Sequence, residues 1–434
     1  MRRSIYTRLL EWKSSTERKP LLLQGARQVG KTYIVREFGK NEYNDFVHLN
    51  FERDPDLKQL FQGKIDPFKI IEEIGFYANR KITAKNTLIF FDEIQECEEA
   101  ITALKYFNEE AADYHLIAAG SLMGVAVGKS RSFPVGKVNF LTMYPMSFGE
   151  FLWAYNENLL FERILKNKDF DPFSKVIHEK LIDYLKIYLF LGGMPEVIDN
   201  YITNKDISWA RNIQNEIVKA YHNDFSKYST SSEAVKTREI WHSIPFQLAR
   251  ENKKFKYNDV RKKARASHFE SSIEWLHQAG LIYISYNISA PKLPISGYAD
   301  RSKFKVYMLD TGLLGALLNV SPQIIIQPNQ LFKEFNGAFI ENFVASELTN
   351  TFNRELYYWT SRGTSEVDFI ISKDDMVLPI EVKSGTSRNL KSLQVYAEKY
   401  LPERIIRTSP RNYHSQDKFV NLPLYALFSI SSVL

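Results

Sequence analysis

Residues 25–32 have the sequence Gly-Ala-Arg-Gln-Val-Gly-Lys-Thr, and this stretch decides the fold of the first part of the chain. It matches the pattern GxxxxGK(S/T) at every fixed position. The apolar run at residues 20–24 predicts a buried strand of a parallel sheet, and residues 31–38 predict a helix that Gly39 can end. A loop between such a strand and helix wraps a phosphate with backbone N–H groups at the positive end of the helix dipole. A chance match is the alternative, and the flanking elements disfavour it.

This loop therefore predicts a nucleotide site. Glycine is needed where a Cβ would collide with a phosphate that the backbone encloses. Lys31 can reach the β- and γ-phosphates, and the hydroxyl of Thr32 can ligate Mg²⁺. The nucleotide-binding residues expected in the loop are Gly25, Ala26, Arg27, Gln28, Val29, Gly30, Lys31 and Thr32.

A second motif, Thr-Leu-Ile-Phe-Phe-Asp-Glu at residues 87–93, supplies the acidic partner of the loop. We expect a buried strand whose last residue, Asp92, binds the nucleotide-associated Mg²⁺ beside Thr32. Glu93 follows directly and is placed to orient and polarise the attacking water as a catalytic residue. Many strands end in Asp at a turn, but the combination with a phosphate loop is specific. The pair of acids favours hydrolysis over phosphate transfer by a kinase.

Three more strands complete the expected parallel sheet, at residues 46–51, 115–121 and 138–143, with helices at 5–18, 67–80 and 98–114. Ser121 ends one of these strands, where its side chain could contact the γ-phosphate. It could equally cap the turn before the following glycine-bearing loop, and both interpretations stay open.

The composition fits a soluble protein of several domains. The chain has 434 residues, of which 44% are hydrophobic and 25% charged. Its single cysteine, Cys97, excludes an internal disulfide and a thiolate-rich zinc site, which suits a reducing cytoplasm. No apolar run approaches the length that spans a bilayer, so we expect a cytoplasmic protein without a membrane partner.

Positive charge is concentrated in one segment. Residues 253–265 contain seven Lys or Arg and one Asp, hence +6, which equals the formal net charge of the whole chain. Helices expected at 243–250, 258–265 and 267–279, followed by a strand at 281–286, give the winged-helix pattern. One interpretation is binding of DNA phosphates by Lys253, Lys254, Lys256, Arg261, Lys262, Lys263 and Arg265.

The alternative is a winged helix that packs against the nucleotide-binding part of the chain, with its lysines solvated. The third helix of the pattern carries His268, Glu270, Glu274 and His277 and no Lys or Arg. Such a helix is poorly equipped to recognise guanine edges, so sequence-specific binding is disfavoured.

The last part of the chain contains a second constellation of charged residues. Strands are expected at 305–309, 356–359, 367–371 and 377–383, with a helix at 336–348. A hairpin centred between Asp374 and Asp375 places Asp368 opposite Glu381, close enough to share one metal ion. Lys383 lies on the same face by strand alternation, and Glu341 of the helix is the expected fourth member. Apolar side chains should fill the other face: Val367, Phe369, Ile380 and Val382.

Several of these motifs together resemble the AAA-type ATPases of bacteria and archaea that carry a C-terminal domain of unknown function. The likeness rests on residues 25–32, 90–95, 144–151, 191–196 and 221–224, and covers nearly the full chain. It implies ATP as the nucleotide and supplies no cellular role. One departure is Gly136-Lys137, where the family tends to have Gly-Arg. Lysine lacks the bidentate fork of arginine, and Arg131 is a nearby substitute.

The C-terminal carboxylates and lysine resemble the catalytic centre of the PD-(D/E)XK nuclease superfamily. This resemblance implies catalytic roles for Asp368, Glu381 and Lys383 and metal binding by Glu341, Asp368 and Glu381. The alternatives are a surface-charged hairpin, or a nuclease fold kept as a scaffold without metal chemistry.

We therefore expect a multidomain α/β protein. Its predicted parts are a P-loop (AAA/ASCE-type) parallel-sheet ATPase core at 1–150, a helical lid at 151–205, a winged-helix-like domain at 206–300 and a restriction-endonuclease-like domain at 301–434. The predicted function is Mg²⁺-dependent ATP hydrolysis that controls a module acting on nucleic acid. The alternative is a signalling or scaffold ATPase whose C-terminal domains bind protein. A homo-oligomer is left open by the sequence.

Overall fold

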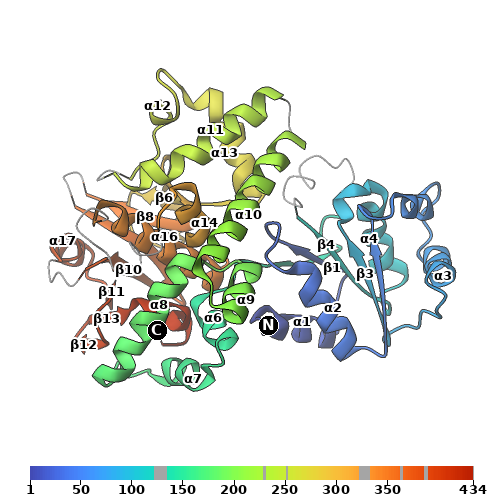
Figure 1. The fold of residues 1–434 in the computed structure, drawn as a ribbon, viewed down its shortest axis with the longest axis horizontal. Coiled ribbons are helices and arrows are strands. Elements are labelled where there is room, and N and C mark those ends of the chain that lie inside the picture. The colour runs from blue at the N-terminus through green and yellow to red at the C-terminus, as the bar shows by residue number, and fades with distance from the viewer. Residues whose placement is uncertain are drawn as a thin grey trace. The chain divides into compact units, whose positions relative to one another are not determined.

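The computed structural model describes residues 1–121, 134–227, 231–250, 253–321, 333–361, 365–385 and 390–433. Contacts divide the chain into two units. The first contains Met1–Tyr144 and Gln278–Gly280, and the second contains Pro145–His277 and Leu281–Leu434. Figure 1 labels many of the helices and strands of each unit.

The first unit is built on a five-stranded parallel sheet, as the sequence predicts. Its strands are β1 (Leu21–Gln24), β2 (Asp45–Asn50), β3 (Thr87–Asp92), β4 (His115–Gly120) and β5 (Asn139–Thr142). They lie in the order β2-β3-β4-β1-β5, so β4 separates the strand before the phosphate loop from the strand that ends in Asp92. Because all five are parallel, the carboxyl ends of β1, β3 and β4 meet at one edge of the sheet.

Helices and an aromatic core support this sheet. The helical elements are α1 (Ile5–Ser14), α2 (Lys31–Glu42), η1 (Pro55–Phe61), α3 (Pro67–Ala78), η2 (Ile94–Glu96) and α4 (Glu98–Glu110). Phe91 of β3 meets Phe51, Phe61 and Phe107 edge-on, with ring centroids 5.5–6.1 Å apart. This packing fixes the strand from which Asp92 extends.

The prediction that Gly39 ends the helix after the phosphate loop was wrong. Helix α2 continues to Glu42, and Gly39 is buried within it. A Cβ at this position would collide with the ring of Phe46. The glycine therefore permits close packing of helix on strand, a tertiary requirement that the local sequence does not show.

The second unit begins with a helical region. Its helices are α6 (Phe148–Ala154), α7 (Asn158–Lys166), α8 (Lys175–Leu191), α9 (Pro195–Asn204), α10 (Ile207–Lys227), α11 (Ser231–Leu248), α12 (Tyr257–Val260) and α13 (Ala266–Gln278). Among the described helices, none combines the length and the apolar character needed to cross a membrane.

An eight-stranded mixed sheet forms the rest of this unit, in the order β12-β13-β11-β10-β9-β8-β6-β7. Figure 1 labels β6, β8, β10, β11, β12 and β13 of this sheet. Its strands are β6 (Ile282–Ile288), β7 (Ala299–Met308), β8 (Leu356–Thr360), β9 (Glu366–Lys373), β10 (Met376–Val382), β11 (Ile405–Ser409), β12 (His414–Gln416) and β13 (Phe419–Pro423). The accompanying helices are η3 (Ile295–Tyr298), α14 (Thr311–Leu317), α16 (Lys333–Phe352), α17 (Lys391–Tyr400), η5 (Leu424–Ser429) and α18 (Ile430–Val433).

Residues 151–205, predicted as a lid on the ATPase core, pack instead within the second unit. Phe161 of α7 stacks on Phe428 of η5 with ring centroids 5.1 Å apart. The backbone N–H of Phe148 donates to Glu347 Oε1 of α16 at 2.8 Å. The sequence of these helices does not show which neighbour covers them.

The strand predicted as a wing is also placed differently. It is β6, which pairs antiparallel with β7 and parallel with β8 inside the large sheet. The predicted boundary at residue 300 consequently falls within β7, just after the β6–β7 connection, and the second helix of the pattern is reduced to Tyr257–Val260. Six of the seven residues of β6 are buried, which suits a strand paired on both sides better than a wing.

The Gly192-Gly193 pair ends α8. Gly192 has φ 72°, and a Cβ there would collide with the carboxylate of Asp310. Asp310 accepts a hydrogen bond from the N–H of Gly193 at 2.5 Å and caps α14 through the N–H of Leu313 at 2.9 Å. The two glycines therefore let one buried carboxylate join the end of α8 to the start of α14.

Candidate functional site

The phosphate loop follows a path that only glycine allows at two positions. Gly25 has φ 145°, and a Cβ on it would collide with the carbonyl of Met143. Gly30 has φ 96° and immediately precedes α2. The loop is further held by Arg3, whose buried guanidinium donates to the carbonyls of Val29 at 2.9 Å and Tyr144 at 2.6 Å. Arg3 was missed because it precedes the first predicted helix and belongs to no motif.

Lys31 lies inside the curve of this loop. Its ammonium group donates to the carbonyls of Gly25 and Ala26, both at 2.8 Å, and the side chain is buried. Burial lowers the pKa of Lys31 to about 8, although the nearby Glu93 and Asp92 carboxylates act in the opposite direction. The lysine is thus placed where an anion enclosed by the loop would meet it.

Thr32 and Asp92 are brought together as predicted. The hydroxyl of Thr32 lies 3.2 and 3.0 Å from the two carboxylate oxygens of Asp92, which is almost fully buried. His48 and Asn50, both near the end of β2, hold the same carboxylate. His48 Nε2 lies 3.1 Å and Asn50 Nδ2 lies 3.2 Å from Asp92 Oδ2. A hydroxyl beside an oriented carboxylate is a donor set that suits Mg²⁺.

The sequence interpretation missed His48 and Asn50. A signal was available, because both are polar residues at alternate positions of an otherwise apolar strand. Arg36 lies 3.2 Å from Nδ1 of His48, so the ring is engaged on both of its nitrogens. This network fixes the orientation of the Asp92 carboxylate.

Glu93 leaves the end of β3 in a left-handed conformation, with φ 51°. Its Oε2 accepts hydrogen bonds from the Ser121 hydroxyl at 2.9 Å and from Gln95 Nε2 at 2.6 Å. Arg27 Nε lies 3.3 Å from the same hydroxyl. Ser121 therefore positions Glu93 in this structure, while its predicted contact with a γ-phosphate stays a prediction.

Of the two basic residues considered as charge-neutralising partners, the structure describes only Lys137. Lys137 forms an ion pair with Glu109 of α4 at 2.9 Å. Arg131, the substitute candidate, falls outside the described residues.

The hairpin of the second constellation has the predicted register. Pairing runs from Met376 with Lys373 to Ile380 with Phe369, which makes Asp368 and Glu381 the next opposed residues. Asp368 Oδ2 accepts a hydrogen bond from the N–H of Val382 at 2.8 Å. Lys383 Nζ donates to Glu381 Oε1 at 2.6 Å. The structure therefore gathers Asp368, Glu381 and Lys383 at one end of the β9–β10 pair.

The predicted apolar face is not continuous. Val367 packs in a cluster with Ile370 and Leu393 of α17, whereas the ring of Phe369 lies 5.6 Å from that of Tyr307 on β7. Val367 and Phe369 thus have different surroundings, and Val382 is only half-buried.

A β-bulge explains this correction. Tyr357 of β8 pairs with Ile370 of β9, and Trp359 pairs with Val367. The paired positions are two residues apart on β8 but three apart on β9, so β9 contains one extra residue. Strand alternation cannot anticipate such an extra residue. The bulge spans Asp368, the residue whose carboxylate the prediction used.

Lysines occupy the centre of the acidic cluster, which the sequence interpretation missed. Lys305 of β7 has no exposed surface; its Nζ lies 3.0 Å from Glu341 Oε1, 2.7 Å from Glu366 Oε1 and 3.9 Å from Asp368 Oδ1. Lys253 forms an ion pair with the second oxygen of Glu341. The available signal for Lys305 was a charged residue directly before the apolar run Val-Tyr-Met-Leu at residues 306–309.

Burial and these charges together set the protonation of the cluster. Burial raises the pKa of Asp368 to about 8, and the Glu341 and Glu381 carboxylates add to the effect. Burial also raises the pKa of Glu381, whose Oε2 has no hydrogen-bond partner among the described residues. For Glu341 burial acts upward, but Lys253 and Lys305 outweigh it and bring the pKa to about 2. Tyr307 donates a further hydrogen bond to Glu341 Oε1 at 2.6 Å.

The cluster is therefore internally neutralised. In the part of the chain that the structure describes, no group of three His, Cys, Asp or Glu side chains is arranged to hold a metal ion. Metal binding by Glu341, Asp368 and Glu381 stays a prediction, and for Glu341 it requires displacement of two lysines.

The basic segment at 253–265 is divided between interior and surface. Lys253 is bound to Glu341, and Arg261 lies 2.6 Å from Glu239. Four of its cations are exposed and have no ion pair among the described residues: Lys256, Lys262, Lys263 and Arg265. The segment can present positive charge, but fewer of its side chains are available than the sequence suggests.

Three family models match the chain. Residues 17–152 match the family described as AAA domain, 182–324 a domain of unknown function (DUF8612) and 336–427 a domain of unknown function (DUF4143). The first unit thus contains an AAA-type ATPase domain, followed by domains of unknown function. No curated protein matches the chain by sequence.

Similar solved structures include the Walker-type ATPase PABY2304 of Pyrococcus abyssi, with a TM-score of 0.45, 13% identity and coverage of 73% of this chain and 95% of that one. The ORC1 protein of Aeropyrum pernix, solved in complex with DNA, gives 0.29 and 12%, with coverage of 73% and 91%. Cdc6p from Pyrobaculum aerophilum gives 0.24 and 12%, with coverage of 74% and 91%. Likeness at this level supports no conclusion about what this chain binds.

Proposed function

We propose that the protein is a Mg²⁺-dependent ATPase whose active site lies at the carboxyl edge of the five-stranded sheet. The observation that carries this proposal is the contact of Thr32 with Asp92, at 3.0 Å, next to a Glu93 held by Ser121 and Gln95. A loop match alone predicts phosphate binding. A metal-binding pair and a positioned carboxylate beside it are what hydrolysis requires.

Each residue has a distinct task in this proposal. The backbone of the phosphate loop encloses the phosphates, and Lys31 exchanges its two carbonyl contacts for the β- and γ-phosphate oxygens. Thr32 and Asp92 would hold Mg²⁺, which would supply positive charge beside the phosphates. His48 and Asn50 act as positioning residues, because both hold the carboxylate of Asp92.

Glu93 is proposed to orient the attacking water and to accept its proton. Two neutral donors, the Ser121 hydroxyl and the Gln95 amide, hold its carboxylate. An oriented carboxylate can make a water more nucleophilic in line with the bond to the leaving phosphate. Arg27, whose Nε lies 3.3 Å from the Ser121 hydroxyl, would link a bound γ-phosphate to this network.

ATP hydrolysis and binding by purified full-length protein test the proposal. Wild-type protein should release phosphate with Mg²⁺ and stop when EDTA removes it. Lys31→Ala should lose ATP binding, whereas Lys40→Ala, an exposed lysine on the same helix, should behave as wild type. ATP binding that persists undiminished in Lys31→Ala would contradict the assignment.

For the second unit, the neutralised cluster favours the scaffold interpretation over nucleic-acid cleavage. We propose that Glu341, Asp368, Glu381 and Lys383 form a structural charge centre and that ATP hydrolysis controls partner binding by this unit. The observation behind it is the placement of Lys253 and Lys305 on both oxygens of Glu341. Nicking of plasmid DNA with Mg²⁺ or Mn²⁺, lost in Asp368→Ala and Glu381→Ala, would instead establish the nuclease function.

Nucleic acid as that partner has one supporting feature, the exposed cations Lys256, Lys262, Lys263 and Arg265. If these four cations contact phosphates, the affinity for duplex DNA should fall steeply as the salt concentration rises. Replacing them by Glu should lower the affinity equally for all DNA sequences. No binding at low salt would favour a protein partner.

A further inference from the structure

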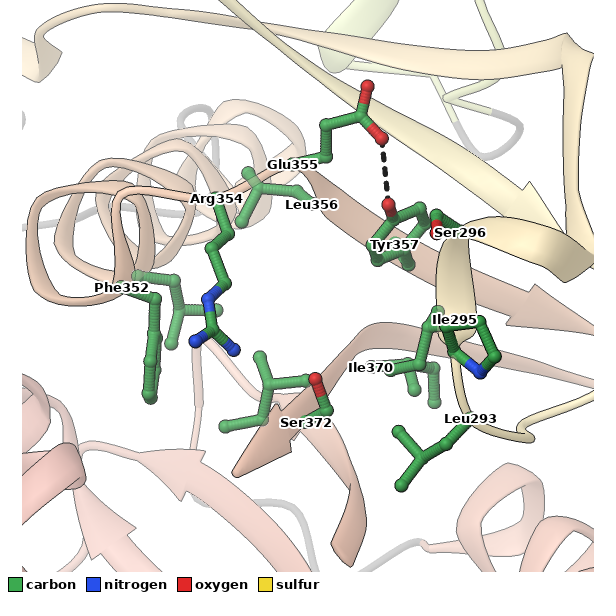
Figure 2. A pocket seen from close by; sticks show the side chains of 13 residues that line it. Leu293, Ile295, Ser296, Phe352, Arg354, Glu355, Leu356, Tyr357, Ile370 and Ser372 are labelled. Carbon is green, nitrogen blue, oxygen red and sulfur yellow. Dashed lines mark hydrogen bonds between the residues drawn. The ribbon is translucent and has the colours of Figure 1, made fainter. Parts of the chain in front are cut away.

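A cavity of about 600 Å³ opens in the second unit, apart from the acidic cluster. Segments distant in sequence line it: residues 293–296 of the β6–β7 connection, the end of α16 with the start of β8, and residues 370–372 of β9. Figure 2 shows Leu293, Ile295 and Ile370 on one side of the cavity and Phe352 on the other. The volume lies in the range of small-molecule sites in proteins, which are mostly apolar with few polar groups.

One cation enters this apolar cavity. Arg354 follows the end of α16, and its guanidinium points into the cavity near Ser372 (Figure 2). In the described part of the chain, the structure gives this guanidinium no carboxylate partner and no hydrogen bond, including to the carbonyls that end α16. An arginine that only complemented the helix dipole would point at those carbonyls.

The acid beside it does not neutralise it. Glu355 is bound by Arg301, whose NH1 and NH2 lie 3.1–3.2 Å from its carboxylate oxygens. The hydroxyl of Tyr357 donates to Glu355 at 2.7 Å, as the dashed line in Figure 2 marks. Because Glu355 is already satisfied, the charge of Arg354 makes the cavity locally positive.

We propose that this cavity binds a small organic carboxylate with an apolar body. The body would lie against Leu293, Ile295, Phe352 and Ile370, and the carboxylate would take the two parallel N–H groups of Arg354. The hydroxyl of Ser372 is available as a further donor at the same end. This site is independent of the proposed ATPase site, since its lining residues all belong to the second unit.

Calorimetric titration of the full-length protein with decanoate and with decanol tests the proposal. The two probes share an apolar chain and differ in charge, so wild type should bind decanoate in preference to decanol. Arg354→Gln should weaken decanoate binding about tenfold or more and leave decanol binding unchanged. Arg265→Gln, an exposed arginine outside the cavity, is the matched control and should bind decanoate as wild type does.

A second variant tests the cavity itself. Ser372→Trp places a large ring in it and should weaken both probes, while ATP affinity, measured alongside, should be unchanged. Equal binding of decanoate by wild type and Arg354→Gln would overturn the proposal. So would no measurable decanoate binding, or equal binding of decanoate and decanol by the wild type.

Discussion

Lys31 should make ATP binding depend on pH around pH 8. In the absence of nucleotide, burial lowers the pKa of this lysine to about 8. ATP would place negative charge beside it and raise that pKa, so binding must take up a proton wherever the free protein has lost it. The affinity should therefore fall as pH rises through about 8.

The size of the effect follows from the protonated fraction of Lys31. With a pKa of about 8, that fraction falls from about 0.9 at pH 7 to about 0.1 at pH 9. If only the charged form binds, ATP affinity falls about tenfold over this range. A lysine at the ordinary value of 10.5 would lose about 3% of its affinity over the same interval.

Isothermal titration in buffers of different ionisation heat measures both quantities. Proton uptake should be about 0.5 per ATP at pH 8 and approach one at pH 9. Lys31→Arg retains its charge throughout, so any binding it keeps should vary little with pH. No proton uptake by the wild type at pH 8–9, with unchanged affinity, would refute the buried position of Lys31.

Three further predictions concern the second unit. Burial raises the pKa of Glu347 from 4.5 to about 8, so the contribution of its protonated form to stability is lost as pH rises through that range. At pH 9, Glu347→Gln should therefore be up to about 5 kcal/mol more stable than wild type in urea unfolding. Equal unfolding midpoints for the two proteins would contradict this prediction. Gly192→Ala should lower the free energy of unfolding by more than about 2 kcal/mol, because backbone strain adds to the collision with Asp310. The control Gly63→Ala, which has a positive φ but open space around its Cβ, should lower it less, and equal losses in the two variants would contradict the prediction. Lys305→Met should destabilise the protein by about 3–5 kcal/mol in the same assay, because it leaves buried carboxylates unpaired. The control Lys303→Met, at an exposed position, should leave the unfolding midpoint nearly unchanged. An unchanged midpoint in Lys305→Met would argue against the charge centre.

Local patterns predicted most of the first unit. The phosphate loop, the acidic strand and the order of strands along the chain depend on residues that are neighbours in sequence. The β9–β10 register was also predictable, because a tight turn at residues 374–375 fixes which residues oppose each other. In each case the deciding interaction spans few residues.

The failures share the opposite property. That β6 joins a large sheet, that α6 and α7 pack in the second unit, and that Lys305 fills the acidic cluster all depend on partners far away in the chain. The error at Gly39 has the same cause, because this position requires glycine to make room for the ring of Phe46 on a neighbouring strand. An apolar or charged residue indicates that a partner exists, but not which one.

Single-turnover hydrolysis by Glu93→Gln tests the central claim most directly. The substitution keeps the shape of the side chain and its contacts with Ser121 and Gln95 within reach, but removes the carboxylate that would accept a proton. We predict unchanged ATP affinity and hydrolysis slowed about a hundredfold or more. Turnover equal to that of the wild type, with ATP bound equally well, would contradict the claim that this edge of the sheet is an ATPase active site.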